Sequence, residues 1–254
     1  LLPGGHVTSE PSTTADDNEI ARFNALAATW WDSQGPMWPL HRLNQFRIKI
    51  LLQQLAQQSR IDSNSKLPLH GKQVLDIGCG GGILSESLAK LGAQVVAIDL
   101  AENNIAIARQ HAAEQGLDID YRSQEAGTFS AQFDLVFNME VVEHVANLET
   151  FLEASCQHVK PGGLMFLSTI NRTLKSYLFA ILGAEYVLKL LPKGTHQWSK
   201  FVRPATLSSL LSDNGLDTIW RQGVSLNPFN KSYHTTESLA INYMLAATKP
   251  DEKA

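Results

Sequence analysis

The chain has 254 residues, of which 44% are hydrophobic and 18% are charged, values typical of one large soluble α/β domain. Its formal net charge of -4 excludes a global basic field, so we expect no nucleic-acid partner. The two cysteines, Cys79 and Cys156, are too few for a disulfide scaffold and are expected to be reduced thiols. No uninterrupted apolar run reaches the length that spans a membrane.

The beginning of the chain consists of a polar stretch and two predicted helices. Residues 1–17 lack the apolar core of a secretory signal and the arginines of a transit peptide, so we predict a disordered lead-in and one domain over 18–254. Apolar residues then recur at helical spacing and predict a helix capped by Asp17 or Asn18. A second helix is expected over about 45–58.

Short apolar segments that alternate with helical ones determine the predicted fold. They lie at 73–77, 94–99, 119–122, 133–138 and 164–170. Such alternation with short links predicts a doubly wound, Rossmann-like parallel sheet with helices on both faces. The end of the chain differs, because an apolar helix over about 174–190 precedes two expected strands near 216–224 and 238–248, the last of them antiparallel.

The strongest local signal is the Gly-rich turn in VLDIGCGGG, after the first strand. The strand ends at Asp76, and a turn containing Gly78 and Gly80 leads into a helix whose N-terminus offers free N–H groups to a ligand. A dinucleotide site needs a small residue where Ile83 stands, and no Gly-Lys-Ser/Thr follows for a phosphate loop. The turn therefore matches neither phosphate binder, and the alternative to a ligand site is a plain tight turn.

Two further residues lie at the ligand-binding edge of the predicted sheet. Asp99 ends the second strand, 21 residues beyond Gly78, at the spacing where an acidic residue binds ribose hydroxyls in nucleoside-binding folds. The alternative role for Asp99 is that of a helix N-cap. Met139 follows the fourth strand. From this position we expect it to make an apolar or backbone contact to an adenine or a methyl donor.

The segment EVVEH after Met139 carries the candidate catalytic groups. If it forms one helical turn, Glu140, Glu143 and His144 share one face. Two carboxylates and an imidazole suit a divalent metal or an acid/base cluster. The alternative is an acidic first turn that interacts with a helix dipole.

Several segments together resemble the ubiquinone biosynthesis O-methyltransferases, a family of class I S-adenosylmethionine methyltransferases. They are ARFNALAATWWD, LHRLNQFR, VLDIGCGGGILSESLAKLGA, EVVEHV, KPGG, LSTINRT, GAEYVLKLLPKGTH and INYM, over about 20–248. The resemblance implies a class I sheet of seven strands, S-adenosyl-L-methionine as the methyl donor, and N-terminal helices. It also implies methylation of two acceptors, a 2-polyprenyl-6-hydroxyphenol and a 3-demethylubiquinol.

The same resemblance assigns roles to individual residues. Cofactor contacts are expected at Arg47, Gly78, Asp99 and Met139, with Asp76 and Gly80 in the same turn, and a Mg²⁺ ion at Glu140, Glu143 and His144. A metal held by both catechol oxygens would lower the phenol pKa, and the alternative is Glu143 or His144 as a general base. The chain departs from the family in reading Gln-Phe-Arg where Pro-Leu-Arg is usual, and in a loose match over 228–238.

A lipid-soluble acceptor implies contact with a membrane. The apolar segment at about 174–193 has lysines at its ends and lies within an expected lid over 173–200, so it favours binding to a membrane surface or anionic lipid. The alternative is a core helix. We therefore expect a cytoplasmic protein peripherally associated with the inner membrane, on the matrix side in a eukaryote, with other ubiquinone biosynthesis proteins as partners.

Three competing functions stay open from the sequence. A class I methyltransferase for another small hydroxyl acceptor has the same fold, because the fold does not fix the acceptor. An NAD-dependent dehydrogenase is opposed by Ile83 in the turn. A non-catalytic lipid-binding accessory subunit is opposed by the retained Gly-rich turn, Asp99 and EVVEH.

Overall fold

The computed structural model places most of the chain in one α/β domain. It describes residues 14, 16–35, 37–173, 200–227 and 229–251. The predicted apolar helix and lid over 174–199, and nearly all of the predicted lead-in, lie outside these residues. No helix within the described ranges is both long enough and apolar enough to cross a membrane.

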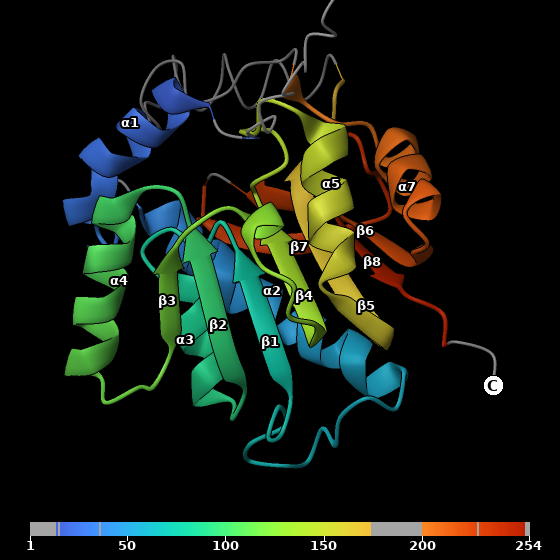
Figure 1. Ribbon diagram of the computed structural model, residues 1–254, viewed down its shortest axis with the longest axis horizontal. Helices are drawn as coiled ribbons and strands as arrows, with labels where there is room; N and C mark the ends of the chain where they lie inside the picture. The colour runs from blue at the N-terminus through green and yellow to red at the C-terminus, as the bar shows by residue number, and fades with distance from the viewer. Residues whose placement is uncertain (1–13, 15, 36, 174–199, 228, 252–254) are drawn as a thin grey trace, which may run out of the picture.

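Eight strands form one sheet in the order β3-β2-β1-β4-β5-β8-β6-β7 (Figure 1). They are β1 (Gln73–Ile77), β2 (Gln94–Asp99), β3 (Asp120–Ser123), β4 (Phe133–Met139), β5 (Val159–Ile170), β6 (Asp217–Asn227), β7 (Ser232–Thr236) and β8 (Asn242–Thr248). Neighbours from β3 to β5 are parallel, and β8 is antiparallel to both β5 and β6. The doubly wound sheet and its antiparallel last strand are therefore confirmed.

The strand count was predicted wrongly, because β7 forms an eighth strand. It pairs antiparallel with β6, with Leu226 opposite Tyr233. The sequence of β7 is SYHTT, and Tyr233 is one of only two of its five residues that are partly buried. A polar edge strand of this kind lacks the apolar alternation that marks a strand in sequence.

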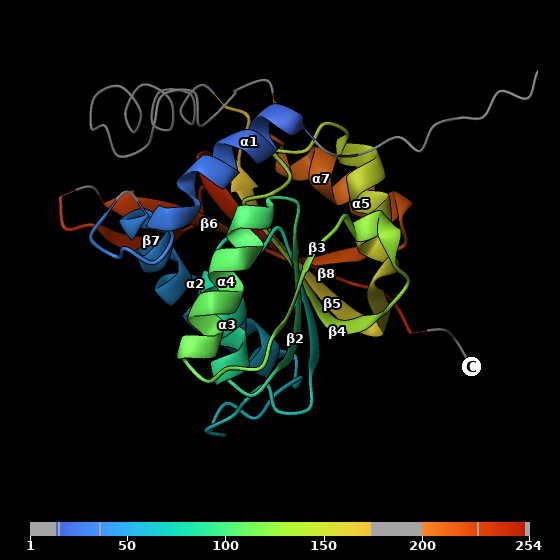
Figure 2. The ribbon, with the colours of Figure 1, turned by 60° about the vertical axis from the view of Figure 1, so that its left-hand side comes forward.

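Helices cover both faces of the sheet (Figure 2). On one face lie α2 (Trp38–Gln57), α3 (Ile83–Lys90) and α4 (Glu102–Glu114), and on the other lie α5 (Leu148–Gln157) and α7 (Pro204–Asp213). Two separate apolar clusters fill the space between the sheet and these helices. The domain therefore has three layers, helices, sheet and helices, as expected for a sheet that is apolar on both faces.

The N-terminal helices begin earlier than the sequence predicted. Helix α1 (Asp17–Leu26) is capped by Asp16, whose carboxylate accepts bonds from the N–H groups of Asn18 and Glu19, so neither predicted cap residue has that role. Helix α2 begins at Trp38 rather than near residue 45, because the proline that follows Trp38 suits the first turn of a helix.

The topology gathers the carboxyl ends of the parallel strands at one edge. Strand β4 lies on the opposite side of β1 from β2, so the crossovers reverse direction between β1 and β4. Ligands bind at such a switch point in open α/β sheets. Because β6 runs parallel to β5, the end of β6 and its turn into β7 lie at this same edge.

A buried histidine joins the loop before β4 to the end of α5. The two ring nitrogens of His158 each lie 2.7 Å from a carbonyl oxygen, Nδ1 from Ala131 and Nε2 from Ala126. The ring also stacks on Phe129, with centroids 4.3 Å apart. His158 is 1% exposed, so its loss would leave a cavity and remove the buried contact to the carbonyl of Ala126.

We therefore expect His158→Ala to lower the free energy of unfolding by about 2–4 kcal/mol, from lost packing and a lost buried hydrogen bond. Urea denaturation measures the change, and His70→Ala, at an exposed histidine, is the control. Equal stability of the two variants would contradict this role for His158.

Candidate active site

The Gly-rich turn brings backbone N–H groups to the carboxyl end of β1. Gly78 and Gly82 have φ values of 72° and 87°, a region where a side chain would be strained. The N–H of Gly78 donates to the carbonyl of Ile98 at 2.8 Å, which ties the turn to the end of β2. A Cβ on Gly78 would also collide with the Val141 side chain, so the turn and the segment after β4 pack closely.

Asp99 lies beside this turn, as the spacing predicted. Its Oδ2 accepts a 2.9 Å bond from the N–H of Gly80, and its Oδ1 accepts one of 2.8 Å from the N–H of Ala101. The alternative role of helix N-cap is wrong, because Ala101 is the N-cap residue of α4 and this second bond reaches only the N–H before the helix. Burial raises the pKa of Asp99. Its Oδ1 also accepts a longer, 3.5 Å bond from Asn104 Nδ2, so Oδ2 is the oxygen that keeps a lone pair for a further donor.

Two tryptophans from the N-terminal segment cover the turn. The indole of Trp30 lies against Gly80 and Gly81, where a Cβ would collide with the ring, and its Nε1 donates to Asn104 at 2.8 Å. Trp31 donates from Nε1 to the carbonyl of Gly81 at 3.0 Å. Glycine is therefore required here because an aromatic ring packs directly on the backbone.

A buried cation joins α2 to the ends of β4 and β5. Arg47 donates from Nη2 to Glu140 Oε1 at 2.9 Å and to Ser168 Oγ at 3.1 Å, and Ser168 donates to the same carboxylate oxygen at 2.6 Å. Arg47 is 5% exposed, and its Nε has no hydrogen-bond partner. Asp76 interacts electrostatically with Arg47, so the guanidinium lies between two strand ends.

Two buried carboxyl groups have raised pKa values. Burial raises the pKa of Asp76 to about 7, against the effect of a 2.6 Å bond from Ser85. Burial and, to a smaller extent, the nearby Glu140 raise the pKa of Glu143 to about 7, although Thr169 donates to it at 2.7 Å. Both groups therefore titrate near neutral pH, as is common for groups in active sites.

His144 is oriented by α1. Its Nδ1 lies 2.9 Å from Glu19 Oε2, and the ring of Phe23 meets the imidazole edge to face, with centroids 5.3 Å apart. The pKa of Glu19 is lowered because the favourable interactions with His144, together with weaker ones from Arg22, outweigh burial. The N-terminal helix thus fixes one ring nitrogen of a predicted catalytic residue.

The metal site predicted at Glu140, Glu143 and His144 does not form. The predicted helical turn is wrong, because Glu140 has a φ of 59° and no helix begins until α5. The three side chains consequently point to different partners, Arg47 and Ser168, then Thr169, then Glu19. Nowhere in the described part of the chain do three His, Cys, Asp or Glu side chains form a group that could hold a metal ion.

The remaining predicted residue, Met139, lies at the end of β4 opposite Ser168 on β5. It is 8% exposed, so only a small part of it can meet a ligand. The sequence did not single out Ser168, Thr169 or Glu19. The first two belong to LSTINRT, a segment quoted for the family resemblance, whereas nothing in the sequence links Glu19 to His144 across 125 positions.

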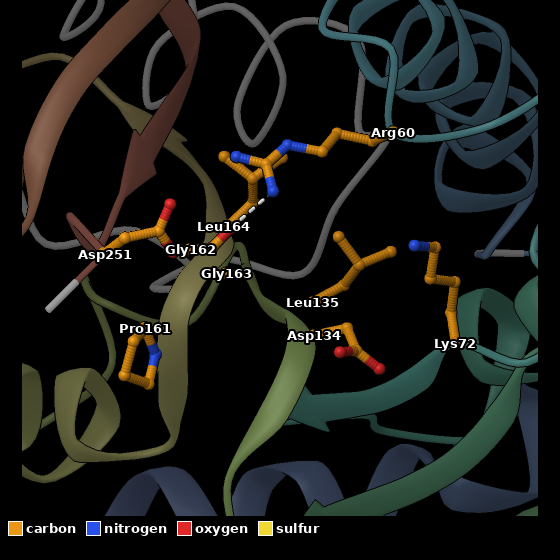
Figure 3. Close-up of a pocket in the computed structure, with 9 residues that line it drawn as sticks. All are labelled: Arg60, Lys72, Asp134, Leu135, Pro161, Gly162, Gly163, Leu164 and Asp251. Atoms are coloured by element: carbon orange, nitrogen blue, oxygen red, sulfur yellow. Dashed lines mark hydrogen bonds between the residues drawn. The ribbon is translucent and has the colours of Figure 1, made fainter. Parts of the chain in front are cut away.

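A polar pocket of about 190 Å³ lies at the opposite, amino edge of the strands (Figure 3). Both cations and carboxylates line it, namely Arg60, Lys72, Asp134 and Asp251. It contains none of the predicted site residues and lies away from the Gly-rich turn.

Comparison with known proteins identifies the family. Residues 43–220 match the model of a methyltransferase domain. The ubiquinone biosynthesis O-methyltransferase of Roseobacter denitrificans is 50% identical over 244 residues, which cover 94% of this chain and 98% of that one. The protein of the same name from Brucella anthropi is 47% identical, over 96% of this chain and 100% of its own. The chain belongs to the ubiquinone biosynthesis O-methyltransferase family. It is an S-adenosylmethionine-dependent O-methyltransferase, as the sequence predicted.

Solved structures of lower identity agree on the fold. Magnesium protoporphyrin IX methyltransferase from Synechocystis PCC 6803, with bound SAH, superposes with a TM-score of 0.60 at 19% identity over 92% of this chain and 94% of that one. The PH0226 protein from Pyrococcus horikoshii gives a TM-score of 0.60 at 17% identity, over 90% and 98% of the two chains. These likenesses support the Rossmann-like methyltransferase sheet of this family member.

The raised pKa of Asp76 predicts a pH-dependent cost to stability. In the unfolded chain this carboxyl ionises near its usual value of 3.8, whereas in the folded chain it ionises near 7. The folded state therefore binds the proton more tightly, and its stability falls as pH rises from about 4 to 7. Asp76→Asn removes this cost, so we expect it to stabilise the protein by ~2–3 kcal/mol at pH 8 and not at pH 3.5. Denaturant unfolding at the two pH values measures this, and equal effects at both would contradict it.

Proposed function

We propose that this methyltransferase transfers a methyl group from S-adenosylmethionine to a phenolic oxygen of polyprenylated catechols, including a 2-polyprenyl-6-hydroxyphenol and a 3-demethylubiquinol. The observation that carries the proposal is the 50% identity to a ubiquinone biosynthesis O-methyltransferase over nearly the whole of both chains. The bond from the Gly-rich turn to Asp99 and the buried Arg47 support binding of the methyl donor, and the buried Glu143 supports proton removal from the acceptor.

The rim at the ends of β1 and β2 fits the methyl donor. Asp99 Oδ2 can accept a bond from a ribose hydroxyl group, and the N–H groups of the turn from Gly78 to Gly80 lie next to this carboxylate. Arg47 is buried with an unpaired Nε, which is a costly arrangement that a carboxylate ligand would relieve. We propose these residues as the cofactor contacts, with Asp76 behind the turn and Met139 at its edge.

When it is bound, S-adenosylmethionine supplies an electrophilic methyl group on a sulfonium. The protein must then remove the acceptor proton, because a phenol with a pKa of about 10 is scarcely ionised at neutral pH. Glu143 suits this task, since its pKa of about 7 lets it be ionised yet basic near neutral pH. The phenolic oxygen bonds to the methyl carbon as the carbon–sulfur bond breaks, and the proton passes to the Glu143 carboxylate.

His144 is the alternative base. Its Nδ1 is held by Glu19, which leaves the opposite ring nitrogen to accept a proton, as in a base positioned by a carboxylate. We place no step on a magnesium ion, because the three residues expected to hold one have separate protein partners.

The acceptor is expected at a membrane surface, because a polyprenyl tail partitions into lipid. The proposed location is therefore peripheral, at the inner membrane. Two other functions remain testable, a smaller soluble hydroxyl acceptor and an accessory subunit that binds lipid without turnover.

The first test measures transfer of a labelled methyl group to a short-tailed demethylubiquinol and to a soluble catechol, each with and without EDTA. We expect transfer to the prenylated acceptor at a rate that EDTA does not change. Faster transfer to the soluble catechol would show that the acceptor is a soluble hydroxyl compound and not a polyprenylated catechol. Binding of the donor without any transfer would support the accessory role. Loss of activity in EDTA that Mg²⁺ restores would overturn the metal-free scheme.

Glu143→Gln should lower kcat by about 10²–10⁴-fold, because the amide cannot take a proton, while the affinity for S-adenosylhomocysteine stays unchanged. The wild-type rate should rise with pH and level off above about 7, where Glu143 is ionised. Thr169→Val removes a bond that favours the carboxylate and should move this rise to higher pH.

His144→Gln separates the two candidate bases. If Glu143 takes the proton, the rate of the His144→Gln variant should still increase with pH near 7. Loss of turnover in His144→Gln, with full turnover in Glu143→Gln, would assign the proton to His144.

Asp99→Ala should weaken binding of S-adenosylhomocysteine by roughly 10–100-fold, the usual effect of losing hydrogen bonds to a charged group. Isothermal titration calorimetry measures the affinity, and thermal unfolding reports whether the turn next to Gly80 stays folded. Asp120→Ala, at a strand start where the side chain is exposed, is the control. An unchanged affinity in a folded Asp99→Ala protein would argue against ribose binding there.

A further inference from the structure

The turn between β6 and β7 exposes a phenylalanine completely. Phe229 is 97% exposed, whereas the next most exposed large apolar residues in the described part of the chain, Leu67 and Ile219, are 47% and 44% exposed. Exposing a whole phenyl ring to water is unfavourable by about 1.5–3 kcal/mol relative to burying it. Together with the aromatic and basic groups beside it, this ring is a candidate contact residue.

Local hydrogen bonds fix the turn that presents this ring. The N–H of Phe229 donates to Asn227 Oδ1 at 3.0 Å, and the N–H of Ser232 donates to Asn230 Oδ1 at 3.1 Å. Asparagine side chains that accept from a residue two positions later hold the backbone in a turn. The backbone on both sides of the ring is thus ordered by its own side chains.

Helix α2 lies alongside the hairpin and adds aromatic and basic groups. The Lys231 ammonium lies 4.8 Å from the centre of the Trp38 ring, and Phe46 contacts Tyr233 with ring centroids 6.2 Å apart. The exposed Arg42 is four residues from both Trp38 and Phe46, so it lies on the same face of the helix.

Helix α2 and the β6–β7 turn carry cations and no carboxylate of their own. Neither α2 nor residues 218–236 contain an aspartate or glutamate. Asp217 begins β6 at the end of the strand opposite the turn, and Glu237 directly follows β7. An exposed aromatic ring flanked by cations matches the interface of an anionic bilayer, where the ring enters the headgroup region and the cations meet phosphates.

The hairpin also connects this surface to the proposed acceptor site. Tyr233 interacts electrostatically with Glu140 and Arg47, and it follows Phe229 by four residues, which span at most about 13 Å. The turn lies at the same edge of the sheet as the strand ends that form the site. In Figure 2 the hairpin extends beside α2.

We propose that the β6–β7 turn, with Phe229, Lys231 and the start of α2 at Trp38, docks on the headgroup region of an anionic lipid bilayer and aims the acceptor site at it. This inference rests on the proposed function, because a polyprenylated acceptor is what brings the enzyme to a bilayer. The turn is a contact distinct from the apolar segment at 174–193.

A single label tests the docking directly. Cys79 and Cys156 are both buried, and the chain has no other cysteine, so Phe229→Cys places one accessible thiol at the turn for an environment-sensitive fluorophore. Leu67→Cys is the matched control, since Leu67 is exposed but precedes β1, at the opposite edge of the sheet.

With phosphatidylcholine vesicles containing phosphatidylglycerol, and without any acceptor, we expect the label at 229 to shift to shorter wavelength and to be quenched by brominated lipid. The label at 67 should do neither. An unchanged label at 229 on protein that sediments with these vesicles would overturn the proposal. A shift that appears on raising protein concentration without lipid would overturn it in favour of a second copy of the chain as the partner.

Sedimentation with the same vesicles measures how much the turn contributes to membrane binding. Phe229→Ala should lower partitioning by roughly tenfold, and Lys231→Gln by about fivefold at low salt, whereas Leu67→Ala should have no effect. Phe229→Ala should keep wild-type methyl transfer to a short-tailed acceptor in detergent. Loss of that transfer would mean that Phe229 acts within the site instead, and would count against docking. Failure of the wild type itself in detergent would overturn the proposed function and leave the vesicle result standing.

Discussion

The buried contact of Arg47 with Glu140 and Ser168 sets the geometry of the whole site. A charge removed from water is costly unless it is paired, and breaking such a pair costs about 3–5 kcal/mol because the partner is left uncompensated. Here the pair joins helix α2 to the ends of β4 and β5. Glu140 itself has a positive φ, and Glu143 and His144 lie nearby with other partners, Thr169 and Glu19. The three residues predicted to share a metal thus each bind a different protein group.

The N-terminal segment completes the site from outside the sheet. Helix α1 has no fully buried residue, although Phe23 and Leu26 pack on a small apolar cluster around Trp30 and Ile83. Polar contacts add to this packing, through the Glu19 carboxylate on His144 and, just after the helix, the two tryptophan N–H groups that reach Asn104 and Gly81. Such contacts are individually weak in net terms, and they are the kind that can open and reclose at modest cost. A segment bound in this way can both cover a cofactor and release it.

The sequence predicted the central fold and the donor side of the site better than the acceptor side. Strands β1 to β5 and the pairing of Asp99 with the Gly-rich turn follow from apolar runs and short spacings, which are properties of neighbouring residues. The helical turn at Glu140 failed because its conformation depends on Arg47, 93 positions earlier. Strand β7 failed because its polar residues form a strand only by pairing with β6. In both cases a distant partner, absent from any local pattern, decides the structure.

Three largely buried carboxyl groups lie at the carboxyl ends of the strands, where a cationic ligand would interact favourably with them. Burial raises the pKa of Asp76, Asp99 and Glu143 alike, so each is held in an environment that disfavours its charge, with Arg47 as the buried cation between β1 and β4. This arrangement costs stability in the free protein. A ligand with a sulfonium and an ammonium group would offset that cost through Coulombic attraction in a dry site. The strain in the free protein would then appear as affinity and selectivity for the charged donor over its neutral-sulfur product. Release of the product would follow from the loss of one positive charge in the reaction itself.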